Sequence, residues 1–159
     1  MTKEIDYMLE EWKFSRQNTV ELINALGDNG LKMDLPRPIL NTFCKHFQEM
    51  ISIQKSYSNA IKNGVMCFEE EEFDGKSSCA ELIATMNEID KEMQENLRET
   101  AFWCEIDWGE GEKKTVSSHL CALATHEIFH IGQLVAFCYV KNIKLPDFLL
   151  DNWALPQSR

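Results

Sequence analysis

The sequence lacks any apolar run that approaches the roughly 20 residues of a membrane-spanning helix, and its first residues are charged rather than apolar. We therefore expect no membrane partner, no signal peptide and a cytoplasmic location. Basic residues are also scarce, with 16 Lys and Arg against 26 Asp and Glu and a net charge of −10. Because proteins bind nucleic acids through clustered Lys and Arg, this balance argues against a general nucleic-acid binder.

The six cysteines do not form a CxxC pair anywhere in the chain. They are Cys44, Cys67, Cys79, Cys104, Cys121 and Cys138. Scattered cysteines in a cytosolic protein usually remain free thiols that are mostly buried. We therefore expect neither a disulfide framework nor a zinc–thiolate site.

The apolar residues recur every three or four positions in four long segments, and the sequence has no repeat of fixed period. This spacing places the apolar side chains of each segment along one face of a helix. The length of 159 residues suits one domain, to which we assign residues 1–159. The predicted fold class is all-α, a four-helix bundle. The direction of each helix stays open, because the two middle connections are long enough to cross over.

Glycine and proline mark the boundary between the first two predicted helices. The first helix covers residues 5–26, with a break in its apolar pattern near Arg16. Gly27 and Gly30 then supply a stop, since glycine readily adopts the left-handed conformation that ends helices. Pro36 and Pro38 are predicted to open the second helix, because proline is tolerated in a first turn.

Capping residues and turn signals define the second half of the chain. Ser78 and Glu81 have the spacing of a capping box and predict the start of the third helix. Residues 102–108 are aromatic and roughly alternating, and a glycine-rich turn follows them. This pattern predicts a short hairpin or extended segment before the last long helix. Thr115 or Ser117 begins that fourth helix.

Histidines lie at interior positions of two predicted helices. His126 and His130 are four residues apart, so their imidazoles lie one turn apart on one helix face and can reach one metal ion. His46 falls within the apolar stripe of the second helix, where its ring nitrogens require partners. His119 is two turns before His126, beyond the reach of the same ion. We expect it to be a hydrogen-bonded core residue or to lie at the edge of a pocket.

A metal ion would satisfy His46, His126 and His130 together. Zinc, nickel, copper and iron all accept neutral imidazole. We expect one divalent ion, zinc or nickel first, with iron, copper or manganese as alternatives. Three protein ligands leave positions for water or substrate, the pattern of a catalytic rather than a structural site. Histidines that serve only packing and dimerisation are the alternative, and spacing alone does not decide between the two.

Residues 126–130 read His-Glu-Ile-Phe-His and match the HExxH pattern of zinc metallopeptidases, in which Glu127 would be the general base. The longer metzincin pattern fails, because Gly132 comes one residue early and no histidine follows. The peptidase hypothesis is therefore the less favoured one.

Nearly the whole chain resembles the DinB/YfiT-like family of small metal-binding four-helix proteins. The resemblance rests on His46 within Phe-Cys-Lys-His-Phe and on residues 126–133, which have the form HxxxHxGQ. The loop at 108–115 and the C-terminal stretch 145–153 are also similar to family segments. Ile131 stands where many members carry arginine.

The resemblance implies a three-histidine metal site on His46, His126 and His130 at one end of the bundle, and often a homodimer. Some relatives use the metal to activate a low-molecular-weight thiol, and many have no known activity. Our hypothesis is a metal-dependent enzyme that activates a thiol or water for transfer or hydrolysis on a small molecule, with Glu127 as base. A non-catalytic metal- or ligand-binding bundle is the alternative. Glu49 and Gln133 are candidates for hydrogen bonds near the site, or for surface roles.

Overall fold

The computed structural model describes residues 3–99 and 104–157, so Phe102 and Trp103 of the predicted aromatic segment lie outside it. Within the described residues the chain is mostly helical, with five helices and one two-stranded sheet. The elements are α1 (Lys3–Leu31), α2 (Phe43–Asn63), α3 (Cys79–Glu99), β1 (Glu105–Gly109), β2 (Glu112–Thr115), α4 (Val116–Val140) and α5 (Asp147–Trp153).

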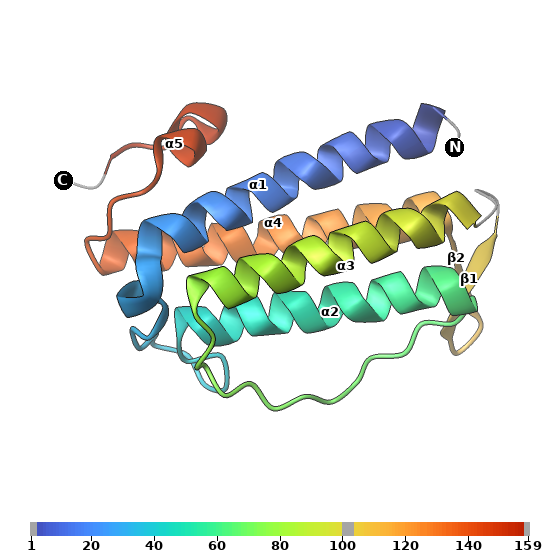
Figure 1. The fold of residues 1–159 in the computed structure, drawn as a ribbon, viewed down its shortest axis with the longest axis horizontal. Coiled ribbons are helices and arrows are strands. Elements are labelled where there is room, and N and C mark those ends of the chain that lie inside the picture. Colours follow the sequence, from blue (N-terminus) through green and yellow to red (C-terminus); the bar gives the residue numbers. More distant parts are fainter. Residues whose placement is uncertain (1–2, 100–103, 158–159) are drawn as a thin grey trace.

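The four long helices lie side by side, and their directions follow from the connections (Figure 1). Helices α1 and α4 run one way, and α2 and α3 run the other way. The loop from α2 to α3 returns along the length of the molecule, so this is the connection that crosses over. Helix α2 packs against α3 and α4, and α1 packs against α4 and α3.

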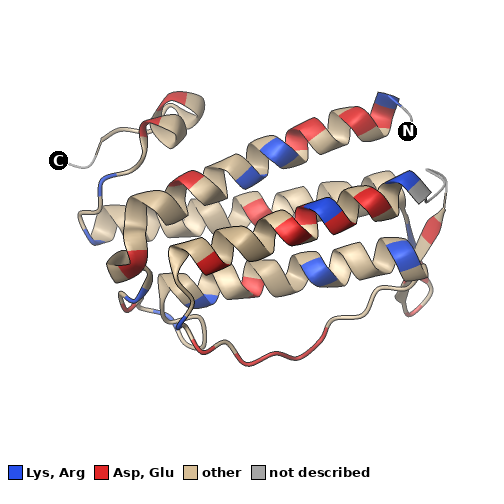
Figure 2. Cartoon of the chain, in the orientation of Figure 1, with Lys and Arg blue, Asp and Glu red and all other residues tan. Residues whose placement is uncertain are grey.

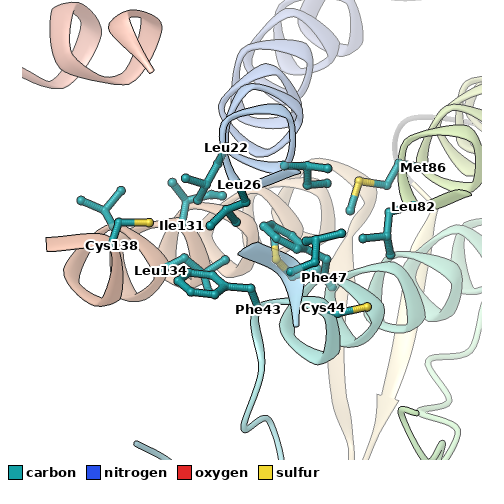
Figure 3. Close-up of a cluster of buried hydrophobic side chains, with 14 of the residues drawn as sticks. Leu22, Leu26, Phe43, Cys44, Phe47, Leu82, Met86, Ile131, Leu134 and Cys138 are labelled. Atoms are coloured by element: carbon teal, nitrogen blue, oxygen red, sulfur yellow. The ribbon is translucent and has the colours of Figure 1, made fainter. Parts of the chain in front are cut away.

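Two apolar clusters fill the interior. The first includes Leu22, Leu26, Phe43, Phe47, Leu82, Met86, Ile131 and Leu134 (Figure 3). The second includes Leu9, Trp12, Tyr57, Ile61, Met93, Leu97, Leu120 and Leu123. Polar residues fall between the two stretches on each long helix, and one from each helix joins a shared group of side chains: Arg16, Gln54, Asp90 and Glu127. A polar layer therefore separates the two apolar clusters.

Of the two boundary predictions for the first two helices, the glycine stop is confirmed in part and the proline start is wrong. Gly27 adopts the non-helical angles φ 61° and ψ 172° and kinks α1, and one further short stretch of helix follows and ends at Leu31, next to Gly30. Pro36 and Pro38 lie in the following loop, not in the first turn of α2. Helix α2 begins later because Thr42 caps it with a side-chain oxygen.

The start signals of the later elements are confirmed. Ser78 donates its backbone N–H and its hydroxyl to Glu81 Oε2, both at 2.8 Å, which completes the capping box. Strands β1 and β2 form the expected antiparallel hairpin. Thr115 then caps α4 by accepting a hydrogen bond from the backbone N–H of Ser118.

Helix α4 is long and apolar enough to cross a membrane by length and composition, with a mean hydropathy of 1.3. A core helix can meet the same criterion, and α4 packs against both α1 and α2. Acidic residues lie along α1, α3 and the loop between α2 and α3, whereas Glu127 is the only Asp, Glu, Lys or Arg in α4 (Figure 2). The expectation of no membrane partner stays a prediction.

His119 is the buried core histidine that its position predicted. Trp108 donates its indole N–H to His119 Nδ1 at 3.2 Å, and His119 Nε2 lies 3.0 Å from the Tyr57 carbonyl oxygen. Both ring nitrogens therefore have partners, and the residue joins the hairpin to α2 and α4. Burial lowers the pKa of His119 to about 4.

Replacing His119 with glutamine should remove part of the acid sensitivity of folding. The pKa of His119 is about 4 in the folded chain against 6.5 as its ordinary value, so the unfolded chain binds more protons between these pH values. The free energy of unfolding should therefore fall as the pH drops from 6.5 to 4, by at most about 3 kcal/mol. A glutamine amide can still accept from Trp108 and donate to Tyr57, but it does not titrate.

Urea unfolding at several pH values checks this prediction. We expect wild type to lose its advantage over His119→Gln as the pH approaches 4. The difference between the two proteins isolates His119 from the other histidines. A difference that stays constant with pH would contradict the prediction.

Candidate metal centre

The centre of the site is a carboxylate from α2 that faces two imidazoles from α4. Glu49 Oε1 lies 3.3 Å from His126 Nε2, and Glu49 Oε2 lies 3.2 Å from His130 Nε2. The donor atoms of the three residues all lie within 4.8 Å of one another. We call Glu49, His126 and His130 the donor cluster. The predicted histidine pair on one face of α4 therefore converges on α2, as its spacing indicated.

His46 adjoins the donor cluster but is not part of it. It is fully buried, and its Nδ1 lies 3.4 Å from Nδ1 of His130. His130 thus directs one ring nitrogen toward Glu49 and the other toward His46. The structure brings the three predicted histidines together, and it adds Glu49, which the sequence marked only as a neighbour of the site.

The chemistry of the donor cluster fits a divalent transition metal. Imidazole nitrogen and carboxylate oxygen are ligands that zinc, nickel and iron accept. His126 Nδ1 is buried and has no hydrogen-bond partner within the described ranges, and buried Glu49 Oε2 forms no hydrogen bond there beyond its 3.2 Å approach to His130 Nε2. A cation between the donors would give this buried carboxylate oxygen a charged partner.

Burial sets the protonation of these groups. Burial, reinforced by the charges of Arg37 and His130, lowers the pKa of His46 to about 4. Burial also lowers the pKa of His130, although the charge of Glu49 opposes this. For Glu49, burial opposes ionisation, but the hydrogen bond from His126 and the neighbouring imidazole charges outweigh it and lower the pKa. At neutral pH the cluster therefore offers a carboxylate and an imidazole nitrogen with a free lone pair.

Arg37 and Gln133 lie beside the histidines. Arg37 donates from its NH1 group to Gln133 Oε1 at 3.0 Å, and the same NH1 lies 3.5 Å from His46 Nε2. Gln133 therefore has the role near the site that its spacing suggested. Sequence reasoning missed Arg37, because it lies in the loop before α2, where no helical periodicity applies. Its only signal was its place between Pro36 and Pro38.

Glu127 faces away from this arrangement. Its carboxylate is 1% exposed, pairs with Arg16 NH1 at 2.9 Å and accepts a hydrogen bond from the Thr19 hydroxyl at 2.5 Å. Burial raises the pKa of Glu127, against the charge of Arg16 and the Thr19 hydrogen bond. The structure therefore gives Glu127 a buried ion-pair partner, and the predicted role as general base receives no support from its placement.

The ion pair belongs to the polar layer that links all four long helices. Arg16 Nε lies 3.3 Å from Asp90 Oδ2, and a second guanidinium nitrogen of Arg16 donates to Gln54 Oε1. The Trp12 indole N–H donates to Asp90 Oδ1 at 2.8 Å. Arg16, which interrupted the apolar stripe of α1, is buried at the centre of this layer.

Comparisons with known proteins agree with the resemblance noted in the sequence. The model of the DinB family matches residues 1–138. Among solved structures, a DinB-like protein from Bacillus subtilis, YjoA, is similar to this chain with a TM-score of 0.65 and 18% identity. The match covers 86% of this chain and 92% of that one, and at this identity it shows the fold alone. None of the curated proteins matches the sequence.

Replacing Arg16 with methionine should destabilise the protein strongly. Removing one partner leaves the Glu127 carboxylate buried without its counter-charge, which typically costs about 3–5 kcal/mol. The double variant Arg16→Met/Glu127→Gln should recover part of this loss, because it removes both charges. Urea unfolding of the two single variants and the double variant measures the coupling.

The exposed Arg98→Met is the matched control, and its effect should stay within about 0.5 kcal/mol. Additive effects of the Arg16 and Glu127 changes would show that the pair does not couple α1 to α4.

Proposed function

The chain belongs to the DinB family, and we propose that it is a divalent-metal-binding protein of that family whose four long helices act as a four-helix bundle. The ion would be held by His126 and His130, with Glu49 and His46 as the remaining candidate ligands. The observation that supports this proposal is the donor cluster between α2 and α4. Zinc or nickel is the proposed metal, since both suit imidazole and carboxylate ligands.

The residues of the site have distinct roles in this proposal. The ring nitrogens of His126 and His130 would present lone pairs to the ion, and the Glu49 carboxylate adds negative charge. The side chains of His126 and Glu49 are 24% and 19% exposed, so a small molecule can approach from their side, whereas His46 closes the buried side. A bound divalent ion would supply Lewis acidity that lowers the pKa of a thiol or of water.

We extend the proposal to an enzyme that activates a thiol or water for transfer or hydrolysis on a small molecule. Assembly as a homodimer and a cytoplasmic location belong to the same proposal. A metal-binding protein without turnover is the second candidate. The ion pair of Glu127 with Arg16 favours that candidate, because it withdraws the residue that sequence reasoning assigned as base.

Metal content tests the binding proposal. It also decides whether Glu49 or His46 is the third ligand beside His126 and His130. Protein purified without a histidine tag and dialysed should retain about one ion per chain, measured by inductively coupled plasma mass spectrometry. We expect His126→Ala and His130→Ala to lose the ion. Of His46→Ala and Glu49→Gln, the variant that loses more metal identifies the third ligand.

His119→Gln is the matched control, since His119 is a buried histidine of α4 with hydrogen-bond partners outside the donor cluster. It should keep its metal. Wild-type protein that retains no metal, or His126→Ala that retains as much metal as wild type, would contradict the proposal.

Turnover separates the enzyme from the binding protein. The metal-loaded protein would be incubated with a small thiol and an electrophile, and separately with a panel of esters and amides. We expect metal-dependent thiol consumption or hydrolysis that His126→Ala abolishes. No reaction with either set at full metal content would favour the non-catalytic protein.

A further inference from the structure

Arg37 brings a positive charge to a site that is built to receive a cation. Its NH1 group lies 3.5 Å from His46 Nε2, next to the donor cluster. Like charges repel, so Arg37 by itself weakens the binding of a metal ion nearby. An anion between the guanidinium and the ion would offset both positive charges.

The loop that carries Arg37 is tied at its base. Leu35 donates its backbone N–H to the Asn41 carbonyl at 2.7 Å, and Asp34 pairs with Thr42 in an isolated antiparallel bridge. Proline on each side of Arg37 restricts the backbone further, because its ring limits φ. The guanidinium is therefore presented toward the histidines from a restrained backbone, which reduces the ordering that a ligand would require.

Arg37 has no carboxylate partner among the described residues, although the chain carries a net charge of −10. The nearby Glu49 directs its two oxygens toward His126 and His130 instead. Arg37 NH1 serves the neutral amide of Gln133, while its Nε and NH2 have no hydrogen-bond acceptor in the described part of the chain. A guanidinium with free donors matches the two oxygens of a carboxylate or phosphate.

We propose that Arg37 binds the carboxylate or phosphate group of an anionic small-molecule substrate at the metal centre. This inference rests on the proposed metal site and names the substrate class of that site. Gln133 positions the guanidinium by accepting its NH1 hydrogen bond.

A titration of cobalt-loaded protein with acetate tests the inference. Cobalt content is measured first, and the visible absorption of cobalt is then followed as acetate is added at constant ionic strength. Wild type should show a saturable change. Arg37→Met should raise the half-saturating acetate concentration at least tenfold, and Arg37→Lys should fall between the two, because an ammonium keeps the charge but not the planar fork.

Arg98→Met removes an equal charge from the last turn of α3 and should leave the acetate titration unchanged. Equal acetate affinity in wild type and Arg37→Met, or equal weakening by Arg98→Met, would overturn the inference. A fully cobalt-loaded wild type without a saturable change would also overturn it while the metal site stands. A wild type that takes up no cobalt would overturn the proposed function and this inference together.

Discussion

The charge of Arg16, buried among the four long helices, is the constraint on which the arrangement of the site depends. The guanidinium pairs with Glu127 on α4 and with Asp90 on α3. Because consecutive residues of a helix are turned about 100° from one another, a Glu127 that faces α1 turns His126 to another side. On that side α2 supplies Glu49. The rotation of α4 that satisfies the buried ion pair is therefore the rotation that builds the donor cluster.

The polar layer also determines how the four long helices are aligned with one another. A buried ion pair contributes little net stability, because desolvation offsets much of the attraction. It does penalise any register that leaves a charge unpaired. The apolar clusters on either side consist largely of leucine, isoleucine, methionine and phenylalanine, which tolerate sliding far better than an ion pair does. We infer that packing stabilises the fold, while Arg16 selects one alignment of the four long helices.

Much of the fold and part of the candidate site could be predicted from the local spacing of residues in the sequence. The histidine pair of α4 follows from an interval of four residues, and the start of α3 follows from the capping box at Ser78. The buried position of Arg16 could not be predicted, because its partners lie on other helices. A charged residue in an apolar stripe first indicates a break in the helix face. Residues 46 and 49 share one face of α2, so which of them meets the α4 pair depends on side-chain conformations that periodicity does not describe. The position of Arg37 beside the histidines depends on how the loop before α2 closes, so helical periodicity could not predict it.

Anomalous X-ray diffraction from crystals of the zinc-supplemented, tag-free protein tests the central claim most directly. The claim is that α2 and α4 hold one divalent ion at the donor cluster. The predicted result is a single strong anomalous peak between Glu49, His126 and His130, within about 2.0–2.2 Å of ligand nitrogen and oxygen atoms. The absence of a peak there, or a peak only at a site away from His126 and His130, would contradict the account.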